Sequence, residues 1–172
     1  MGRNGKGTRL IYPEIFKLHP LPTAQDRDAI LRCIRECLDC SASCTACADA
    51  CLSEDDLQEL VRCIRLNLDC ADSCDATARI LLRQSRPDLR LIHAAIEACR
   101  AARLACGEEC ERHAAHLEHC RLCAEICRRC QQACDDLFAV LVERHKRKTR
   151  SNALPTGVIE GFEARIPLRD VV

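Results

Sequence analysis

Cysteine residues occupy most of the regularly spaced apolar positions in the middle of this chain. Between Cys33 and Cys51 they follow one another at spacings of four, three, four, three and four residues. This alternation places them on one stripe of an α-helix, the stripe that a bundle helix turns towards its partners. Arginine, glutamate, aspartate and serine fill positions between them and can face water. The pattern predicts an amphipathic helix whose buried face consists largely of thiols.

Three further segments repeat this stripe, with other residues at some of its positions. Asn67 lies on the stripe of the second segment and Ala102 on that of the third. His113 continues the third stripe beyond Cys110. In chain order, the candidate metal ligands are Cys33, Cys37, Cys40, Cys44, Cys47, Cys51, Cys63, Asn67, Cys70, Cys74, Cys99, Cys106, Cys110, His113, Cys120, Cys123, Cys127, Cys130 and Cys134. No cysteine lies off a stripe, so we expect the thiols of four helices to converge on one axis.

Pairs of capping residues mark where the first three helices are expected to begin. Each pair has a hydroxyl residue followed three residues later by an aspartate, which has the form of a capping box. The pairs are Thr23 with Asp26, Ser53 with Asp56, and Ser85 with Asp88. With Pro87 in a first turn, they predict helices over residues 24–52 and 54–84, and a third helix that begins near residue 86.

The boundary between the third and fourth helices carries neither glycine nor proline. The pattern from residue 86 to 146 would therefore also allow a single helix, about twice as long as each of the first two. A hairpin near residues 114–117 instead gives four helices of matched length, and we favour it. The expected fold is all-α: an antiparallel up-down-up-down four-helix bundle with a Cys-lined core over residues 24–146.

The two flanks of the bundle have a different character. Residues 1–23 are expected to form an N-terminal arm, which Ile11, Tyr12, Ile15 and Phe16 could anchor on the bundle. Residues 147–172 continue a basic run and are expected to be an irregular, flexible C-terminal tail.

The two ends of such a bundle should differ in chemistry. One end would contain both hairpin turns and would bring His113, His116 and His119 close to cysteines. The other end would collect an apolar plug, which consists of Ile30, Leu81, Leu82, Ile92, Ile96, Leu137 and Leu141. Histidines beside thiols suit a metal entrance, and we expect His113 to bind metal. His116 and His119 could equally be solvated turn residues, and Asn67 could be a metal ligand or a hydrogen-bonding core residue.

Composition separates this chain from the usual cysteine-rich class. Seventeen of its 172 residues are cysteine, a level typical of secreted disulfide scaffolds. However, the N-terminal segment has no apolar run long enough for a signal peptide, and no stretch approaches the length of a membrane span. The 26 basic and 26 acidic residues balance, so nucleic acid is not an expected partner. We interpret the chain as a cytoplasmic protein, without a membrane partner, whose thiols stay reduced.

Two interpretations do without metal. A core that used cysteine only as a small hydrophobe would be thinly packed. Disulfides within a helix close poorly, because neighbouring Cβ atoms on one face lie about 5–6 Å apart and a disulfide needs roughly 3.5–4.5 Å. Disulfides between helices meet no such obstacle. A structural helical protein with redox-active or cross-helix disulfides therefore stays an alternative.

Thiolate chemistry favours copper(I), although zinc and iron–sulfur clusters also use thiolates. A copper(I) ion that replaces a thiol proton leaves the core neutral, whereas four thiolates on Zn²⁺ leave excess negative charge that is costly to bury. The stripes contain no separate quartets, and no proline follows a cysteine as in the bacterial iron–sulfur run. The sequence predicts multiple copper(I) ions per monomer, with a multi-zinc thiolate protein as the alternative.

An enzymatic bundle would need further ligands. A di-iron site requires inward-facing Glu-x-x-His pairs, and no histidine in this chain has a glutamate three residues before it. We therefore expect no enzyme activity.

The cysteine-rich stretches resemble the copper storage proteins, a family of four-helix-bundle copper-binding proteins. The resemblance rests on residues 33–51, 63–74 and 106–134 and covers about residues 24–140. It implies copper(I) bound inside each bundle for storage and detoxification, assembly into homotetramers, and membership of the cytosolic branch. A copper chaperone would then be a candidate partner.

Overall fold

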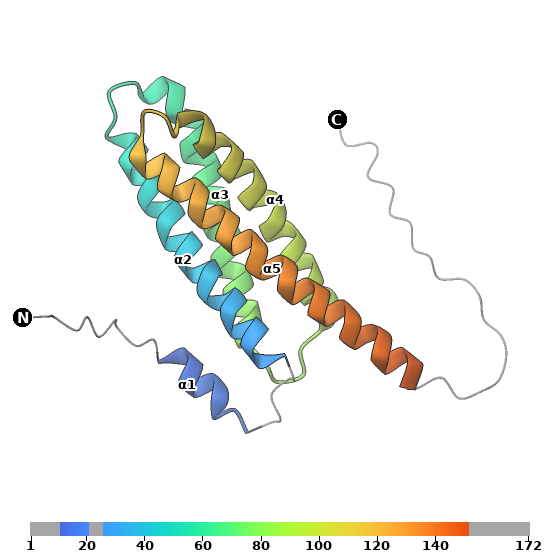
Figure 1. The fold of residues 1–172 in the computed structure, drawn as a ribbon. Helices are drawn as coiled ribbons and strands as arrows, with labels where there is room; N and C mark the ends of the chain where they lie inside the picture. The colour runs from blue at the N-terminus through green and yellow to red at the C-terminus, as the bar shows by residue number, and fades with distance from the viewer. Residues whose placement is uncertain (1–10, 21–25, 152–172) are drawn as a thin grey trace, which may run out of the picture.

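A computed structural model describes residues 11–20 and 26–151, and all regular elements within these ranges are helices. The elements are α1 (Tyr12–Lys17), α2 (Arg27–Leu52), α3 (Leu57–Leu82), α4 (Leu89–His113) and α5 (Glu118–Ser151). The four long helices lie side by side and successive helices run in opposite directions (Figure 1). Helices α2 and α3, α3 and α4, α4 and α5, and α5 and α2 are the packed pairs. The predicted antiparallel four-helix bundle is therefore confirmed.

The long helices α2, α3 and α4 begin about three residues later than the capping pattern predicts. In each case the aspartate of the predicted pair is the residue that precedes the helix. The Asp88 carboxylate accepts a hydrogen bond from the backbone N–H of Arg90 at 2.8 Å, whereas Asp26 and Asp56 make no side-chain cap. Ser53 ends α2 instead of starting α3, and Thr23 lies outside the described residues. The predicted capping boxes at Ser53 and Ser85 are therefore wrong.

The predicted hairpin between the last two helices is confirmed at residues 114–117. The backbone N–H of Leu117 donates to the carbonyl of His113 at 2.9 Å, and that of His116 donates to the same carbonyl at 3.1 Å. These bonds close the turn without glycine or proline. The turn between α2 and α3 lies at the same end of the bundle (Figure 1). We call this the turn end.

Apolar side chains fill the opposite end of the core. The buried members of the predicted plug are Ile30, Leu81, Ile92, Ile96, Leu137 and Leu141. Leu82 is partly buried and packs against the same cluster. Burying a leucine or isoleucine side chain contributes about 1.5–3 kcal/mol relative to leaving it exposed. The conventional hydrophobic core is therefore concentrated at this end, and we call these seven residues the apolar plug.

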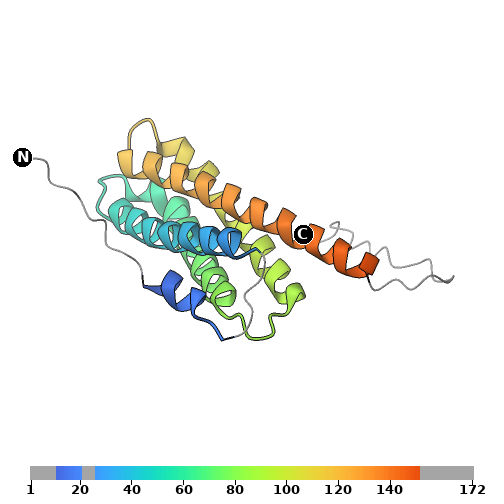
Figure 2. The same cartoon turned by 60° about the horizontal axis from the view of Figure 1, so that its bottom comes forward.

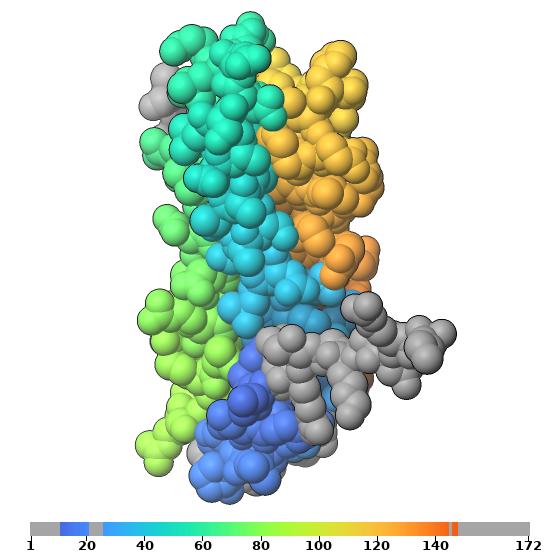
Figure 3. Space-filling model, turned by 90° about the vertical axis from the view of Figure 1, so that its left-hand side faces the viewer, coloured from blue at the N-terminus to red at the C-terminus, as the bar shows by residue number. Residues whose placement is uncertain are grey.

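The short helix α1 lies against the lower part of the bundle in Figure 3, beside the start of α2. Phe16 is buried and Tyr12 is partly buried against the core. Ile11 and Ile15 remain 73% and 65% exposed. The arm is therefore held by its two aromatic residues. The expectation that Ile11 and Ile15 anchor it is wrong, because a helix of six residues can face the bundle on only one side.

Helix α5 continues to Ser151, beyond the expected end of the bundle at residue 146. Its last turns project past the other helices (Figure 2). Lysine and arginine have good helix propensity, so the basic run extends the helix rather than ending it. The expectation of an irregular segment is wrong for residues 147–151, and residues 152–172 lie outside the described part of the chain. Among the described residues, no helix combines the length and apolar character that crossing a membrane requires.

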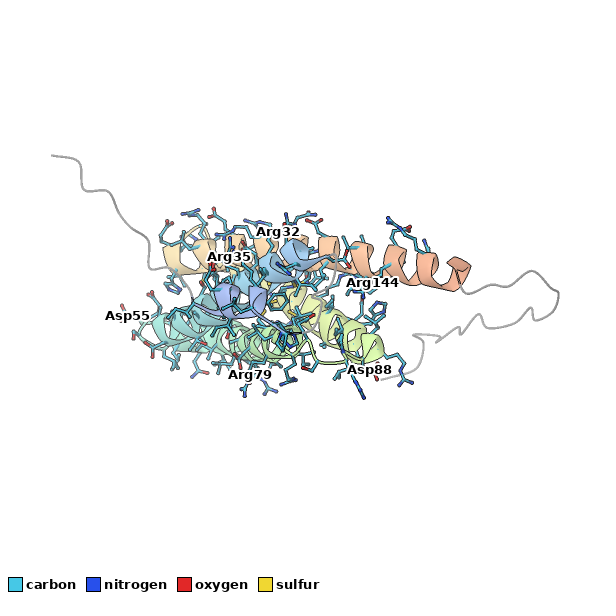
Figure 4. The ribbon with its side chains drawn as sticks, turned by 90° about the horizontal axis from the view of Figure 1, so that it is seen from below. Arg32, Arg35, Asp55, Arg79, Asp88 and Arg144 are labelled. Atoms are coloured by element: carbon cyan, nitrogen blue, oxygen red, sulfur yellow. The ribbon has the colours of Figure 1, made fainter. Side chains whose placement is uncertain are left out.

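Charged side chains cover the outside of the bundle. Arg32, Arg35, Asp55, Arg79, Asp88 and Arg144 all lie on the outer side of the ribbon (Figure 4). Ion pairs join neighbouring helices, such as Arg129 with Glu36 at 2.9 Å and Arg100 with Asp135 at 2.9 Å. Exposed pairs of this kind contribute only about 0–1 kcal/mol each. They leave the interior of the bundle to the thiols.

Candidate metal centre

All seventeen cysteines of the chain are free thiols, and all are buried. The most exposed of them, Cys47, reaches 3%. Because the stripes of α2 to α5 all turn inward, the thiols form one array along the bundle axis. We call this the thiol array. It occupies the part of the core between the apolar plug and the turn end.

Sulfur atoms from different helices approach one another closely throughout the array. The Sγ atoms of Cys33 and Cys134 lie 3.3 Å apart, joining α2 to α5. Those of Cys74 and Cys99 lie 3.5 Å apart, joining α3 to α4. A metal ion at about 2.3 Å from each of two thiolates, the distance found in zinc sites, would separate their sulfurs by about 3.8–4.6 Å. Small outward movements of these side chains would therefore admit metal ions between the helices.

The ligand atoms gather into groups that share members. Each group has its ligand atoms within 4.8 Å of one another. The groups include Cys37, Cys74, Cys99 and Cys130; Cys40, Cys44, Cys70 and Cys127; Cys44, Cys106, Cys123 and Cys127; Cys47, Cys51, His119 and Cys120; and Cys33, Cys37 and Cys134. Cys37, Cys44 and Cys127 each belong to two of these five groups. Shared sulfurs suit bridging thiolates in a continuous array rather than isolated four-ligand zinc sites.

The predicted ligand Asn67 is fully buried among these thiols. Its Oδ1 accepts hydrogen bonds from the thiols of Cys123 at 3.0 Å and Cys106 at 3.4 Å. Its Nδ2 donates to the backbone carbonyl of Cys63 at 2.9 Å. The amide oxygen therefore faces the array, and the amide nitrogen, held by its own helix, also lies 3.6 Å from the Sγ of Cys110 on α4. Both roles that the sequence left open for Asn67 are compatible with this geometry, and metal binding by it stays a prediction.

The histidines of the turn end have different surroundings. The Nδ1 atom of His119 lies 3.4 Å from the Sγ of Cys47 and 3.5 Å from that of Cys120. His113 instead places its Nε2 atom 3.4 Å from a carboxylate oxygen of Glu109, and His116 is exposed. The structure thus brings His119 directly to the thiols. His113 contacts the carboxylate of Glu109 and not a thiol, so metal binding by His113 stays a prediction.

Sequence reasoning underestimated His119 because it lies one position before the cysteine stripe of α5. In the first turn of that helix, this position turns towards α2, where Cys47 lies opposite. Its other ring nitrogen, Nε2, is 3.1 Å from a carboxylate oxygen of Glu54. A carboxylate on the far nitrogen fixes the orientation of an imidazole, as it does in many metal sites. The position of His119 directly before Cys120 is the sequence feature that could have indicated its place beside the thiols.

Next to these histidines, the turn end contains a cavity of about 360 Å³. Its lining consists of Glu54, Asp55, Asp56, Glu59, Leu60, His113, His116 and Leu117. We call it the turn-end pocket. Four carboxylates make it a place where cations gather. Nearby, burial opposes ionisation of Glu109, yet hydrogen bonds from Arg62 and His113 hold its pKa below the usual range.

Burial and hydrogen bonding raise the pKa of several thiols in the array, so these thiols keep their protons in the metal-free protein. Burial raises the pKa of the Cys51 thiol to about 11 at the turn end. Hydrogen bonding with the thiols of Cys106 and Cys123, together with burial, raises the pKa of Cys44 deeper in the core. A soft metal ion must displace such protons to bind, because the thiolate is the ligand. Copper binding by the array would therefore release protons.

Known proteins place this arrangement in context. The structure of the copper storage protein Ccsp from Streptomyces lividans, loaded with 10 copper equivalents, is 49% identical, with a TM-score of 0.73. The match covers 74% of this chain and 98% of that one. A structure of a cytosolic copper storage protein from the same organism, loaded with five coppers, is 54% identical over 66% of this chain and 95% of that one, with a TM-score of 0.65.

Comparison with curated proteins finds no match. The sequence pattern of the copper storage protein family, however, matches residues 26–139, well over half of the chain. The matched range includes all seventeen cysteines, Asn67 and the turn-end histidines. Family match, fold and thiol array agree, and this chain belongs to the copper storage protein family.

Proposed function

We propose that this protein stores copper(I) inside its four-helix bundle, and so sequesters and detoxifies the metal. The observation that carries the proposal is the thiol array, in which seventeen buried, free cysteines form overlapping ligand groups along one axis. The Streptomyces lividans relative with 10 bound copper equivalents supports it. The ligands are the cysteines of the array, with Asn67, His113 and His119 as further ligands.

Charge balance explains why such an array can take up many ions. Each copper(I) ion replaces one thiol proton, so loading leaves the buried core neutral. If each ion binds two sulfurs and each sulfur bridges two ions, the ratio of copper to thiol approaches one. Replacing the copper ions by Zn²⁺ would add buried charge at every step, which is costly in a low-dielectric interior.

The setting of the protein follows from this role. We propose that it works in the cytosol, as the term cytosolic is applied to the Streptomyces lividans relative. Storage requires no chemical conversion of a substrate, so the protein would have no enzymatic activity. We further propose that residues 24–146 form the copper-binding unit, that the bundles assemble as homotetramers, and that a copper chaperone supplies the metal.

The test of this function is a titration of the reduced protein with copper(I) under anaerobic conditions. We expect each monomer to bind many copper(I) ions before it saturates, a number on the scale of its 17 cysteines. Metal analysis after gel filtration gives the bound copper, and a thiol assay on fresh protein gives the number of free cysteines. Protein whose thiols have been alkylated is the control. Saturation at one or two ions would contradict storage, and few free thiols would support the disulfide alternative.

Copper is expected to enter at the turn end. There an arriving ion meets the turn-end pocket and then the imidazole of His119 beside Cys47 and Cys120. Imidazole holds copper(I) less firmly than a thiolate and can pass the ion inward. Variants His113→Ala and His119→Ala should therefore load and release copper at changed rates while capacity falls by little, as measured by stopped-flow transfer from a copper(I) chelator.

The control for these variants is His93→Ala. The ring of His93 packs against Phe138 with a centroid distance of 4.8 Å, on the part of α5 that carries the plug residues Leu137 and Leu141. This variant should load like the parent. If both turn-end variants also load like the parent, or if Leu137→Ala opens a faster route, copper enters elsewhere.

A further inference from the structure

Among the described residues, Arg103 is the one cation that is buried inside the bundle. Its side chain belongs to α4 and is only 1% exposed. The positions Cys99, Arg103, Cys106 and Cys110 follow spacings of four, three and four residues. Arg103 therefore holds a position of the inward stripe next to Ala102, which is partly buried and packs against the core as the sequence pattern predicts.

The guanidinium of Arg103 lies against sulfur and has donors to spare. Its Nη1 donates to the backbone carbonyl of Cys130 at 2.6 Å and lies 3.5 Å from the Sγ of the same residue. Its Nε and Nη2 atoms are buried and make no hydrogen bond. A buried arginine normally uses its planar set of five N–H groups on a carboxylate or phosphate. Here several of these N–H groups are left without a partner.

The described carboxylates near Arg103 are engaged elsewhere or lie outside. Glu111 pairs with Arg128. Glu108 and Glu111 line a surface groove beside Arg103, but the structure gives neither an ion pair with it. The Sγ of Cys130 lies 3.5 Å from the Nη1 of Arg103, so sulfur is the element within its reach that can carry a compensating negative charge. Cys99 belongs to the same ligand group as Cys130, and the Sγ of Cys134 lies 3.8 Å from that of Cys37 in this group.

A neutral copper–thiolate array would leave this buried charge uncompensated. Burying a cation without a counter-charge is far more costly than a single hydrogen bond to a carbonyl can offset. One thiolate in excess of the bound copper removes the difficulty. Such a cluster has n copper(I) ions and n + 1 thiolates, and therefore one negative charge.

We propose that Arg103 is the counter-cation of an anionic copper–thiolate cluster that forms at Cys99, Cys130 and Cys134. The inference rests on the proposed copper storage. In the loaded cluster, n thiol protons are replaced by n copper(I) ions and one further thiol proton leaves to the solvent. No electron moves, because copper stays in the +1 state. The guanidinium restores neutrality, and its free N–H groups donate to cluster sulfurs.

The consequence is that the thiol array is not uniform. The cluster beside Arg103 combines thiolate bonds with a buried ion pair, so it binds copper more tightly than the neutral part of the array. It should therefore fill first when copper is scarce. The ligand group Cys37, Cys74, Cys99 and Cys130, with Cys134 nearby, is the part of the array where these first ions are expected.

The test compares full-length variants for their first copper ions, in competition with an excess of a copper(I) chelator. Arg103→Gln removes the charge but keeps donors, Arg103→Met keeps chain length alone, and Arg103→Lys keeps the charge. Because removing one partner of a buried ion pair is strongly destabilising, Gln and Met should weaken the tightest copper class on the order of 100-fold. Lys should retain most of the affinity. Total capacity should change little in all three.

Arg100→Gln is the matched control, since it removes a partly exposed arginine of the same helix that pairs with carboxylates rather than thiols, and it should bind copper like the parent. Melting temperatures of the copper-free and the loaded variants distinguish a counter-cation from a residue with a purely structural role. If the role were purely structural, the Gln and Met variants would melt at lower temperatures than the parent by the same amount in both states, and their copper affinity would be unchanged. That result, or parent-like affinity in a folded Gln or Met variant, would overturn the inference. Failure of the parent itself to bind copper would instead overturn the proposed function.

Discussion

Loading the reduced protein with copper(I) should raise its melting temperature by about 20 °C or more, and Zn²⁺ should raise it much less. A ligand present at a thousand times its dissociation constant contributes about 4 kcal/mol to folding stability per site. For a chain of this size, 1 kcal/mol shifts the melting temperature by about 2–4 °C. A few well-occupied sites in the thiol array are therefore enough for the expected shift.

The physical reason for a shift of this size is that the core lacks large side chains where the thiols lie. Cysteine is a small hydrophobe, and the conventional core is concentrated in the apolar plug. In the copper-free state the middle of the bundle is held by small buried side chains. Copper bridges would add bonds between all four long helices, which the unfolded chain cannot reproduce in the same geometry.

The measurement is differential scanning calorimetry of copper-free, copper-loaded and zinc-treated protein in the presence of a reductant. Removing the metal with a copper(I) chelator should return the melting temperature to that of the copper-free protein. Protein with alkylated thiols should show no shift with either metal. An equal or larger shift with Zn²⁺ would favour a multi-zinc protein instead.

Replacing Cys44 and Cys127 together by alanine should lower copper capacity by roughly four ions, because each bridging sulfur serves about two ions. The Sγ of Cys44 lies 3.8 Å from that of Cys127, and both residues belong to the two central ligand groups. The double variant leaves each of these groups with two thiols. Neither remaining pair can complete a cluster in which every ion has two bridging sulfurs.

The comparison variant removes Cys33 and Cys51, which lie at opposite ends of the stripe of α2. It deletes the same number of thiols and should cost about two ions, since an end sulfur has fewer neighbours to bridge. Changing cysteine to alanine removes a single heavy atom, so both variants should fold. Copper is counted by metal analysis after gel filtration. Equal losses in the two variants would indicate separate sites rather than a bridged array.

The fold could be predicted because its signal is periodic and redundant. Seventeen cysteines spaced at three and four residues define the inward face of four helices, and the same spacing continues through Ile96 and Leu137 into the apolar plug. A hairpin was expected at residues 114–117 from helix lengths alone. Its turn depends on two backbone hydrogen bonds to the carbonyl of His113. No residue type in this segment indicates such hydrogen bonds.

The features of the site that could not be predicted depend on single side chains rather than on the regular spacing of apolar positions. His119 lies off the stripe, and its contact with Cys47 depends on how the first turn of α5 faces α2. Arg103 lies on the stripe, but an arginine at such a position is ordinarily assigned to water, and Ala102 offered a more conventional choice. Ile11 and Ile15 were expected to pack, yet a helix of six residues can bury only one side.

On the proposed route of copper entry at the turn end, the apolar plug would leave the storage compartment a single opening. With leucine and isoleucine closing one end, an ion deep in the bundle can leave only after the ions between it and the turn end have moved. The copper that arrives last is therefore the first that can be withdrawn. A partly filled protein would exchange the ions near the turn end quickly and those near the apolar plug slowly. The ions bound most recently would then stay accessible, while those bound first would be released last.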